Sequence, residues 1–272
     1  MQKISTSART CEGAPRHWEP GAYLKFEDLR LRPALDLLAQ VPLERPARIT
    51  DLGCGAGNVT PFLRERWPDA NITALDGSAE MLARAKAEQM HLNVTWRQAD
   101  IRSWAAPEPQ DLIYSNAVLH WLDEHEDLFP RLMDELNSGG VLAVQMPNQF
   151  GEPSHTLMRE VARRGPWAQT LAPVLREAPV VEPGVYYDWL SPLAAGLDIW
   201  ETTYTQILDG EDAVLDWIAS TALKPLLEAL DGEMRTAYKD ALAAELLGAY
   251  PKRTDGKTLF AFRRLFIVAR KA

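Results

Sequence analysis

Residues 48–147 alternate short apolar runs with amphipathic segments, and this alternation constrains the fold more than any other feature of the chain. The apolar runs predict five strands, at Ala47–Leu52, Asn71–Asp76, Asn93–Ala99, Asp111–Ser115 and Val141–Gln145. A helix is predicted at Val59–Trp67, and Ser78 is expected to cap the next helix. Strands that alternate with helices form parallel βαβ units, so we expect an α/β fold with a doubly wound sheet that binds ligands at the carboxyl ends of its strands.

The second half of the chain differs from the first in composition and in its pattern of apolar residues. Glu152–Leu197 is rich in proline, tryptophan and tyrosine, and Asp212–Tyr250 has a long helical pattern. Two β-like runs, Ile199–Leu208 and Leu259–Lys271, complete a mostly parallel sheet of seven predicted strands. The expected organisation is a loose extension at 1–17, a core domain at 18–150, a helical lid at 151–198 and 209–255, and the last strands at 199–208 and 256–272. Alternatively, these helices only cover a face of the sheet.

A glycine-rich turn follows the first predicted strand, in the sequence DLGCGAGN. Its glycines are Gly53, Gly55 and Gly57, and glycines so placed allow a tight turn and a close approach to a ligand. The dinucleotide pattern G-x-G-x-x-G needs a third glycine where this chain has Asn58 or Thr60. The pattern therefore fails in both registers, which argues against a nicotinamide-dependent oxidoreductase.

Acidic residues stand at three successive strand ends. Asp51 precedes the glycines and would repel a pyrophosphate, Asp76 ends the second strand, and Asp100 follows the third. A carboxylate such as Asp76 can accept hydrogen bonds from both hydroxyls of a ribose. Three acids at one sheet edge predict a pocket for a positively charged nucleoside without phosphates, and S-adenosylmethionine is such a molecule. The alternative is that the turn binds nothing and Asp51 caps a loop.

The motifs DLGCGAGN, LDGS and QADI resemble those of the class I S-adenosylmethionine-dependent methyltransferases, which have a Rossmann-like fold. The resemblance implies S-adenosylmethionine as the methyl donor, S-adenosylhomocysteine as its product, and no metal. It places Asp51 near the methionyl group, Asp76 on the ribose, and Asp100 or Ile101 beside the adenine. The full set of cofactor-binding residues that it implies is Tyr23, Asp51, Gly53, Gly55, Gly57, Asn58, Asp76, Gly77, Ser78, Met81, Asp100, Ile101, Asn116 and Ala117.

Segments in both halves of the chain resemble the bacterial trans-aconitate 2-methyltransferase family. They include NAVLHWL, GGVLAVQMP, EPSHTLMREVA, YYDWLSP, DIWETTYTQIL and the closing LFIVAR. The resemblance implies transfer of a methyl group to one carboxylate of a small polycarboxylic acid, with a monomethyl ester as product. Three alternatives stay open: a methyltransferase of the same fold that acts on another small acid or on an amine, a nicotinamide enzyme, and a non-catalytic cofactor-binding protein.

An ionised carboxylate acceptor needs no general base, because its reference pKa is roughly 4. We therefore expect no catalytic acid or base, and we expect arginines to bind the carboxylates that do not react. His120 and Trp121 are predicted to position the acceptor. The predicted substrate-binding residues are Tyr23, Arg30, His120, Trp121, Gln145, His155, Arg159, Tyr186, Tyr187 and Arg264, with one of the two tyrosines facing the pocket. Arg32 fits a substrate role and a solvated helix face equally well, and Trp121 and Arg264 could be a core and a surface residue.

The composition narrows the partners of the chain. Its formal net charge is −9 and no run is rich in lysine and arginine, which argues against nucleic acid. Its two cysteines, Cys11 and Cys54, give no disulfide framework, and no apolar run approaches the roughly 20 residues that span a bilayer. The N-terminal residues lack a secretory pattern. We therefore expect a cytoplasmic protein with a small-molecule substrate and no membrane partner, and the oligomeric state stays open.

Overall fold

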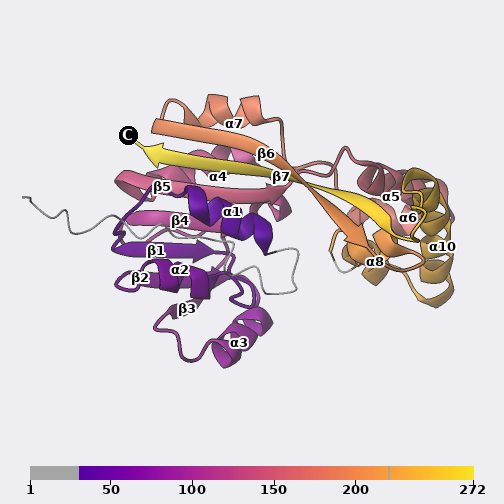
Figure 1. Ribbon diagram of the computed structural model, residues 1–272, viewed down its shortest axis with the longest axis horizontal. Helices are drawn as coiled ribbons and strands as arrows, with labels where there is room; N and C mark the ends of the chain where they lie inside the picture. Colours follow the sequence, from indigo (N-terminus) through magenta and orange to yellow (C-terminus); the bar gives the residue numbers. More distant parts are fainter. Residues whose placement is uncertain (1–30, 220) are drawn as a thin grey trace, which may run out of the picture.

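The computed structural model describes residues 31–219 and 221–272. The predicted ligand contacts of Tyr23 and Arg30, and the predicted extension at 1–17, lie outside these residues. The described part contains one sheet of seven strands (Figure 1). They are β1 (Arg48–Leu52), β2 (Asn71–Asp76), β3 (Thr95–Gln98), β4 (Gln110–Asn116), β5 (Leu136–Pro147), β6 (Ala194–Leu208) and β7 (Thr258–Lys271).

The strand order is β3-β2-β1-β4-β5-β7-β6. β1 to β5 pair in parallel, whereas β7 runs antiparallel to both β5 and β6. The order reverses between β1 and β4, and this switch point is where an open α/β sheet offers a crevice for ligands. The prediction of a doubly wound, mostly parallel, seven-stranded sheet is therefore confirmed.

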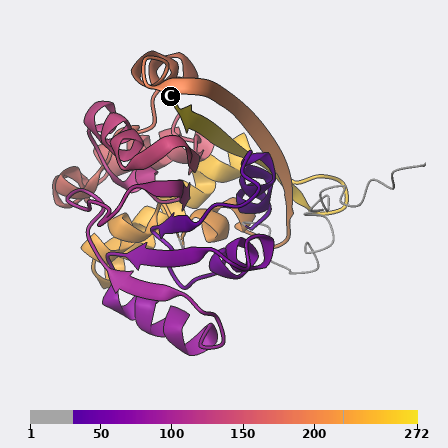
Figure 2. The same cartoon turned by 90° about the vertical axis from the view of Figure 1, so that its left-hand side faces the viewer.

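Helices cover both faces of the sheet (Figures 1 and 2). On one face, α1 (Arg32–Gln40) and α2 (Thr60–Arg66) share an apolar cluster with alternate residues of β1, β4 and β5, and the buried Tyr114 hydroxyl donates to the Ala34 carbonyl over 2.6 Å. On the other face, α4 (His125–Asp134) packs in a second cluster. α3 (Ala79–Glu88) lies beside β2 and β3, and its predicted cap is confirmed, because the Ser78 hydroxyl accepts from the Met81 amide over 3.2 Å.

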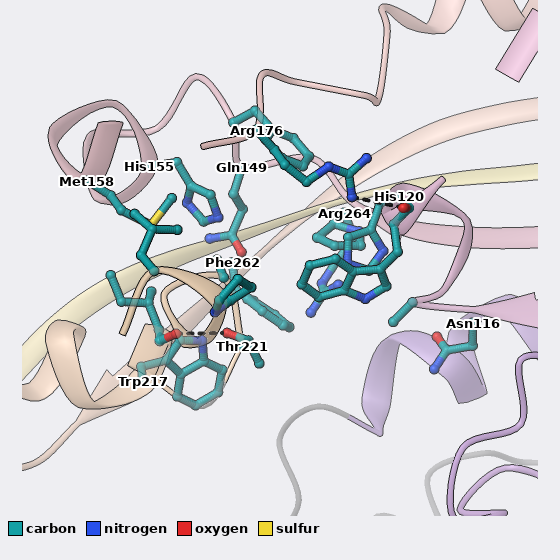
Figure 3. A pocket seen from close by; sticks show the side chains of 18 of the residues that line it. Asn116, His120, Gln149, His155, Met158, Arg176, Trp217, Thr221, Phe262 and Arg264 are labelled. Carbon is teal, nitrogen blue, oxygen red and sulfur yellow. Dashed lines mark hydrogen bonds between the residues drawn. The ribbon is translucent and has the colours of Figure 1, made fainter. Parts of the chain in front are cut away.

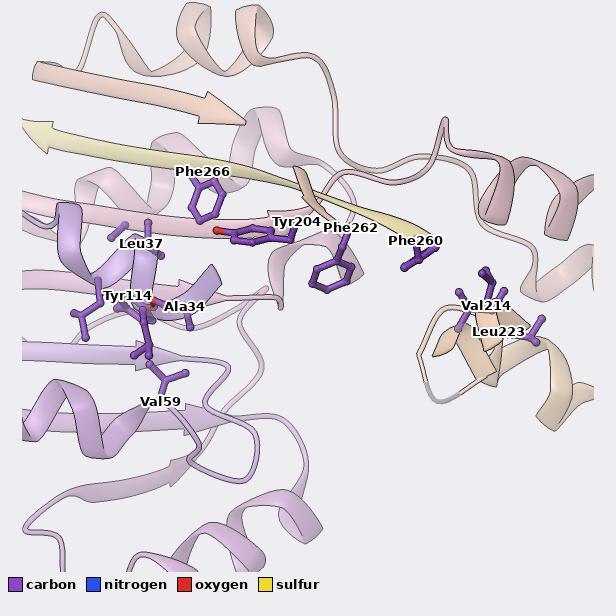
Figure 4. Close-up of a cluster of buried hydrophobic side chains, with 14 of the residues drawn as sticks. Ala34, Leu37, Val59, Tyr114, Tyr204, Val214, Leu223, Phe260, Phe262 and Phe266 are labelled. Carbon is purple, nitrogen blue, oxygen red and sulfur yellow. Dashed lines mark hydrogen bonds between the residues drawn. The ribbon is translucent and has the colours of Figure 1, made fainter. Parts of the chain in front are cut away.

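A second group of helices lies at one end of the molecule, beyond the sheet (Figure 1). It comprises α5 (Pro153–Arg164), α6 (Ala168–Leu171), the short 3₁₀ turn η3 (Ala172–Val174), α8 (Ala213–Ala219), α9 (Lys224–Ala229) and α10 (Gly232–Ala249). We call it the helical cluster. Strands β6 and β7 run from the sheet into it, and the first apolar cluster continues along them through Phe262 and Phe260 (Figure 4). Inside the helical cluster, the Tyr238 hydroxyl of α10 donates to the Met158 carbonyl of α5 over 3.0 Å.

One helix of the predicted lid packs on the sheet and not in the helical cluster. α7 (Pro183–Leu190) falls within the range 151–198, but Tyr186 and Leu190 are fully buried in the second apolar cluster, against α4. The apolar face of α7 packs against α4 and β6, which lie closer to it than the helical cluster does. Strand β6 also begins at Ala194, five residues before the predicted Ile199, because β7 continues to Lys271 and pairs with it along its whole length.

Candidate active site

The glycine turn joins β1 to α2 and adopts left-handed backbone conformations that favour glycine. The φ angles are +77° at Gly53, +55° at Gly55 and +79° at Gly57. A Cβ atom at Gly53 would lie 2.4 Å from the Val118 side chain, and one at Gly57 would lie 2.8 Å from Trp96. At Gly55 nothing lies within 4 Å of that position. Two glycines thus allow the turn to pack, whereas Gly55 leaves open space above it.

Asp76 lies at the carboxyl end of β2 and faces this turn. One carboxylate oxygen accepts from the Gly55 amide and the other from the Ser78 amide, each over 2.8 Å. An ionised carboxylate offers about four lone-pair positions, so two remain for hydroxyl donors. This arrangement supports the predicted role of Asp76 on a ribose, and it also fixes the shape of the turn.

The other two acids have different surroundings. Asp51 is buried and accepts from the Thr60 hydroxyl of α2 over 2.7 Å, and burial raises its pKa to about 6. Asp100 is exposed and forms an ion pair with Arg102 over 2.8 Å, which lowers its pKa. Asp51 thus anchors α2 through Thr60, and Asp100 faces solvent. The placement of all three acids around one cofactor pocket stays a prediction.

The residues at this edge fit S-adenosylmethionine. Gly55 provides open space, Asp76 provides acceptors, and Met81 of α3 is 44% exposed beside the cap at Ser78. Asn116 ends β4, and its buried Oδ1 atom finds no hydrogen-bond partner among the described residues. A cationic group such as the ammonium of the methionyl part would satisfy this acceptor. The Gly77 carbonyl accepts from the Gln98 side chain, and Ile101 is buried.

A cavity of about 380 Å³ opens beside the cofactor edge, between the sheet and the helical cluster (Figure 3). Its sheet side includes Asn58, Asn116, Ala117, His120 and Trp121, and the last two belong to the 3₁₀ turn η2 (Leu119–Trp121). Its other walls come from α5, α8, α9, β7 and the segment after η3. The remaining lining residues are Leu31, Val59, Pro147, Gln149, Phe150, His155, Met158, Arg159, Val174, Arg176, Trp217, Ile218, Thr221, Ala222, Pro225, Leu226, Phe262 and Arg264.

The charged residues of this cavity are all of one sign. Arg159, Arg176 and Arg264 line it, and its described lining contains no aspartate or glutamate. The whole chain carries a net charge of −9, so its surface as a whole does not account for this concentration of positive charge. A cavity lined in this way favours an anion with several charges.

The arginines are held differently. Nη2 of Arg159 donates to the Phe150 carbonyl over 2.6 Å, while its buried Nη1 finds no partner among the described residues. Arg264 is 7% exposed, and its guanidinium lies over the Phe262 ring at 3.6 Å from the ring centroid. Burial lowers the pKa of Arg159, yet an arginine keeps its charge at neutral pH.

Two histidines in the same cavity are neutral. Burial, followed by the positive charge of Arg264, lowers the pKa of His120 to about 3. Burial, followed by the charge of Arg159, lowers the pKa of His155 to about 4. Neutral imidazoles can donate one hydrogen bond and accept another, but they add no charge near pH 7.

Several predicted substrate residues line the cavity, namely His120, Trp121, His155, Arg159 and Arg264. Gln145 does not: it is buried in β5, and the neighbouring Ala117 amide donates to its carbonyl over 2.8 Å.

The prediction that a tyrosine of the Tyr186–Tyr187 pair faces the pocket is wrong. Tyr186 is fully buried beneath α7 with its hydroxyl 2.6 Å from Nδ1 of His125, and Tyr187 is 56% exposed outside the cavity lining. Arg32 also lies outside it, where it pairs with Asp36 at 3.8 Å and covers the Tyr204 ring.

Sequence reasoning missed Gln149, Arg176, Trp217, Thr221 and Phe262. Phe262 could have been predicted from the sequence, because it lies two residues before the candidate Arg264 and therefore on the same face of the strand. Arg176 lies in a proline-rich segment without periodicity, which gave no indication of its direction.

Comparison with known proteins agrees with this geometry. A profile described as "Methyltransferase domain" matches residues 49–140. A protein named trans-aconitate 2-methyltransferase from Azoarcus sp. (strain BH72) is 50% identical over 252 residues, which cover 93% of this chain and 98% of that one. The chain belongs to the trans-aconitate 2-methyltransferase family. A second member, from Methylobacterium radiotolerans, is 48% identical over 258 residues, covering 94% and 98% of the two chains.

Solved structures share the fold at much lower identity. The YcgJ protein from Bacillus subtilis aligns with a TM-score of 0.58 at 13% identity, over 88% of this chain and 98% of that one. This likeness shows the fold alone. The match to the methyltransferase domain and membership of the trans-aconitate 2-methyltransferase family show that the protein depends on S-adenosylmethionine.

Within 31–219 and 221–272, no group of three or more histidine, cysteine, aspartate or glutamate side chains is placed to hold a metal ion. In the same ranges no helix is long and apolar enough to cross a membrane.

The Asp76→Ala variant should lose affinity for S-adenosylhomocysteine by at least about tenfold, since each hydrogen bond to a carboxylate contributes about 1.5–3 kcal/mol. Calorimetry measures the change. Asp111→Ala is the matched control: that carboxylate also accepts from two backbone amides, of Ala47 and Arg48, but at the opposite ends of the strands. Unchanged affinity in a folded Asp76→Ala variant would contradict the ribose assignment.

Proposed function

We propose that this protein is an S-adenosylmethionine-dependent O-methyltransferase that esterifies one carboxylate of a small polycarboxylic acid, trans-aconitate, and releases the monomethyl ester and S-adenosylhomocysteine. The observation that carries the proposal is the cavity beside the cofactor edge, which is lined by three arginines and by no described acid. The relatives that carry the name trans-aconitate 2-methyltransferase support this choice of acceptor.

When bound, S-adenosylmethionine supplies a methyl carbon activated by its sulfonium; a carboxylate oxygen bonds to that carbon as the carbon–sulfur bond breaks and its electron pair stays on sulfur. No proton moves, because a carboxyl group with a pKa of about 4 is already ionised at pH 7. The protein therefore contributes binding, orientation and exclusion of water. Arg159 and Arg264 bind the carboxylates that do not react, and His120 and Trp121 position the acceptor beside the cofactor edge.

The helical cluster acts as a lid in this proposal. Its helices α5, α8 and α9 supply the wall that faces the cofactor edge, including His155, Met158 and Trp217. An unpaired buried charge costs several kcal/mol, so a trianion enters a closed site only where fixed cations replace its water. The core at 18–150 then binds the cofactor, and the helical insertions bind the acid.

An amine acceptor is the second possibility, since the fold also supports methylation of amines. The three arginines disfavour it, because they would repel an ammonium group and the described lining offers no carboxylate to hold one. We also propose that the protein works in the cytoplasm on a free small molecule, without a nucleic-acid or membrane partner. The net charge of −9 argues against nucleic acid.

Purified protein should transfer label from methyl-labelled S-adenosylmethionine to trans-aconitate faster than to cis-aconitate or citrate, and mass spectrometry should show one added methyl group per molecule of acid. Transfer to amines but to no acid would contradict the proposed function. Binding of NADH without binding of S-adenosylhomocysteine would contradict the cofactor as well.

Arg159→Met should raise the KM for trans-aconitate by about one to three orders of magnitude, at roughly 1.4 kcal/mol for each tenfold change, because the guanidinium is lost while much of the apolar stem remains. Cofactor affinity should stay nearly unchanged, and a monocarboxylate should lose much less than the trianion. Steady-state kinetics measure both effects.

Arg164→Met is the matched control for this variant. Arg164 lies on the same helix, but it forms an exposed ion pair with Glu245 outside the cavity lining. Its replacement should leave the kinetics unchanged. If Arg159→Met behaves like this control, the anion is bound elsewhere, around Arg264.

The rate should be flat between about pH 6 and 8.5, because His120 and His155, with pKa values of about 3 and about 4, stay neutral across this range. A histidine with a lowered pKa binds more protons in the unfolded protein than in the folded protein. Its contribution to the stability of the fold is therefore present above about pH 6.5 and is lost as the pH falls towards the pKa of the folded state.

His120→Gln should retain activity within about tenfold of wild type. A wild-type inflection near pH 6.5 that vanishes in His120→Gln would reveal a proton-transfer step.

A further inference from the structure

Arg176 joins the helical cluster to the turn that carries His120 and Trp121. It lies in the segment between η3 and α7, and its side chain lines the cavity while remaining 34% exposed. Its Nη1 donates to the Trp121 carbonyl over 2.9 Å, and its Nη2 donates to the Asp123 carboxylate over 2.6 Å. Each amino group has two N–H bonds, so each keeps one donor for a ligand.

This arginine lies on the cofactor side of the cavity. Figure 3 shows Arg176 close to His120 and Arg264, with Asn116 of the cofactor edge on the same side and His155 and Met158 on the other. The positive charge of Arg176 contributes to the lowered pKa of His120, which agrees with their proximity. Because Arg176 donates to the Trp121 carbonyl, in the turn that follows Asn116 of the cofactor edge, a carboxylate held by Arg176 lies beside that turn.

Asp123 gives Arg176 a different electrostatic character from Arg159. The guanidinium of Arg159 donates to an uncharged carbonyl, that of Phe150, and its charge has no carboxylate hydrogen-bonded to it among the described residues. Arg176 is paired with a carboxylate, so part of its charge is neutralised before any substrate binds.

The difference in charge between Arg176 and Arg159 affects the rate of a methyl transfer to a carboxylate. The acceptor begins as an anion and ends as a neutral ester, so a cation at its reacting group binds the ground state more strongly than the transition state and slows the reaction. The acceptor must nonetheless be oriented towards the methyl carbon. A guanidinium whose charge is partly neutralised can donate oriented hydrogen bonds at a smaller cost in reactivity.

We propose that Arg176 orients the carboxylate that receives the methyl group, and that Asp123 keeps this carboxylate reactive by neutralising part of the guanidinium charge. The inference rests on the proposed function, which it extends by assigning the reacting carboxylate to Arg176 and the other carboxylates to Arg159 and Arg264.

Two substitutions test this assignment, each with two measurements: the Kd of trans-aconitate by calorimetry with saturating S-adenosylhomocysteine, and kcat with S-adenosylmethionine. Asp123→Asn retains an oxygen that accepts from Arg176, and its side chain is 79% exposed in the wild type. It should bind trans-aconitate about two- to fivefold more tightly and turn over about two- to fivefold more slowly, the scale of a partly exposed ion pair. Arg176→Met should bind more weakly and lower kcat by about tenfold or more.

Glu126→Gln is the matched control. It removes the same charge three residues from Asp123, but Glu126 is exposed on α4 and does not line the cavity. Neither Kd nor kcat should change by more than about twofold, as for a rim charge in screening solvent.

The inference requires that the Kd of trans-aconitate falls in Asp123→Asn and rises in Arg176→Met. If Asp123→Asn and Arg176→Met both weaken binding, the ion pair only fastens the segment and the inference is wrong. An unchanged kcat in Arg176→Met also overturns it. A wild-type protein that methylates no acid contradicts the proposed function itself, and an active wild type with equal kcat in all three variants contradicts only the role of Arg176.

Discussion

The long antiparallel pairing of β6 with β7 is the constraint on which the rest of the structure depends. It continues from Ala194 opposite Lys271 to Leu208 opposite Thr258, so two strands belong both to the sheet and to the helical cluster. Arg264 lies within this shared stretch, opposite Pro147 of β5 and Thr202 of β6. A strand held on both sides is a rigid support, and it fixes the helical cluster at the carboxyl edge of the sheet, where the switch point between β1 and β4 already favours a ligand.

The cavity concentrates positive charge inside an acidic protein. The cavity gathers Arg159, Arg176 and Arg264 from three parts of the chain, and their mutual repulsion is a cost that an anionic ligand removes. His120 and His155 stay neutral in this surrounding, since burial and the neighbouring arginines both disfavour their charged forms. The site can therefore bind several carboxylates without carrying a group that must gain or lose a proton.

Sequence reasoning succeeded where local chemistry determines structure. The glycine turn, the cap at Ser78 and the alternation of strands with helices follow from residues close together in the chain. His155 and Arg159 were found by their helical spacing. The errors involve side chains whose direction depends on distant partners: Tyr186 turns to His125 beneath α7, and Arg176 reaches Asp123 across an irregular segment. Neither contact leaves a periodic pattern, so only the folded chain reveals it.

A crystal structure of the complex with S-adenosylhomocysteine and trans-aconitate tests the central claim most directly, namely that the cavity between sheet and helical cluster binds the acid through its arginines. The account predicts one carboxylate beside Arg176 with an oxygen facing the sulfur of S-adenosylhomocysteine, and the other carboxylates on Arg159 and Arg264. Trans-aconitate bound outside this cavity, or bound within it without contact to any of the three arginines, would contradict the account.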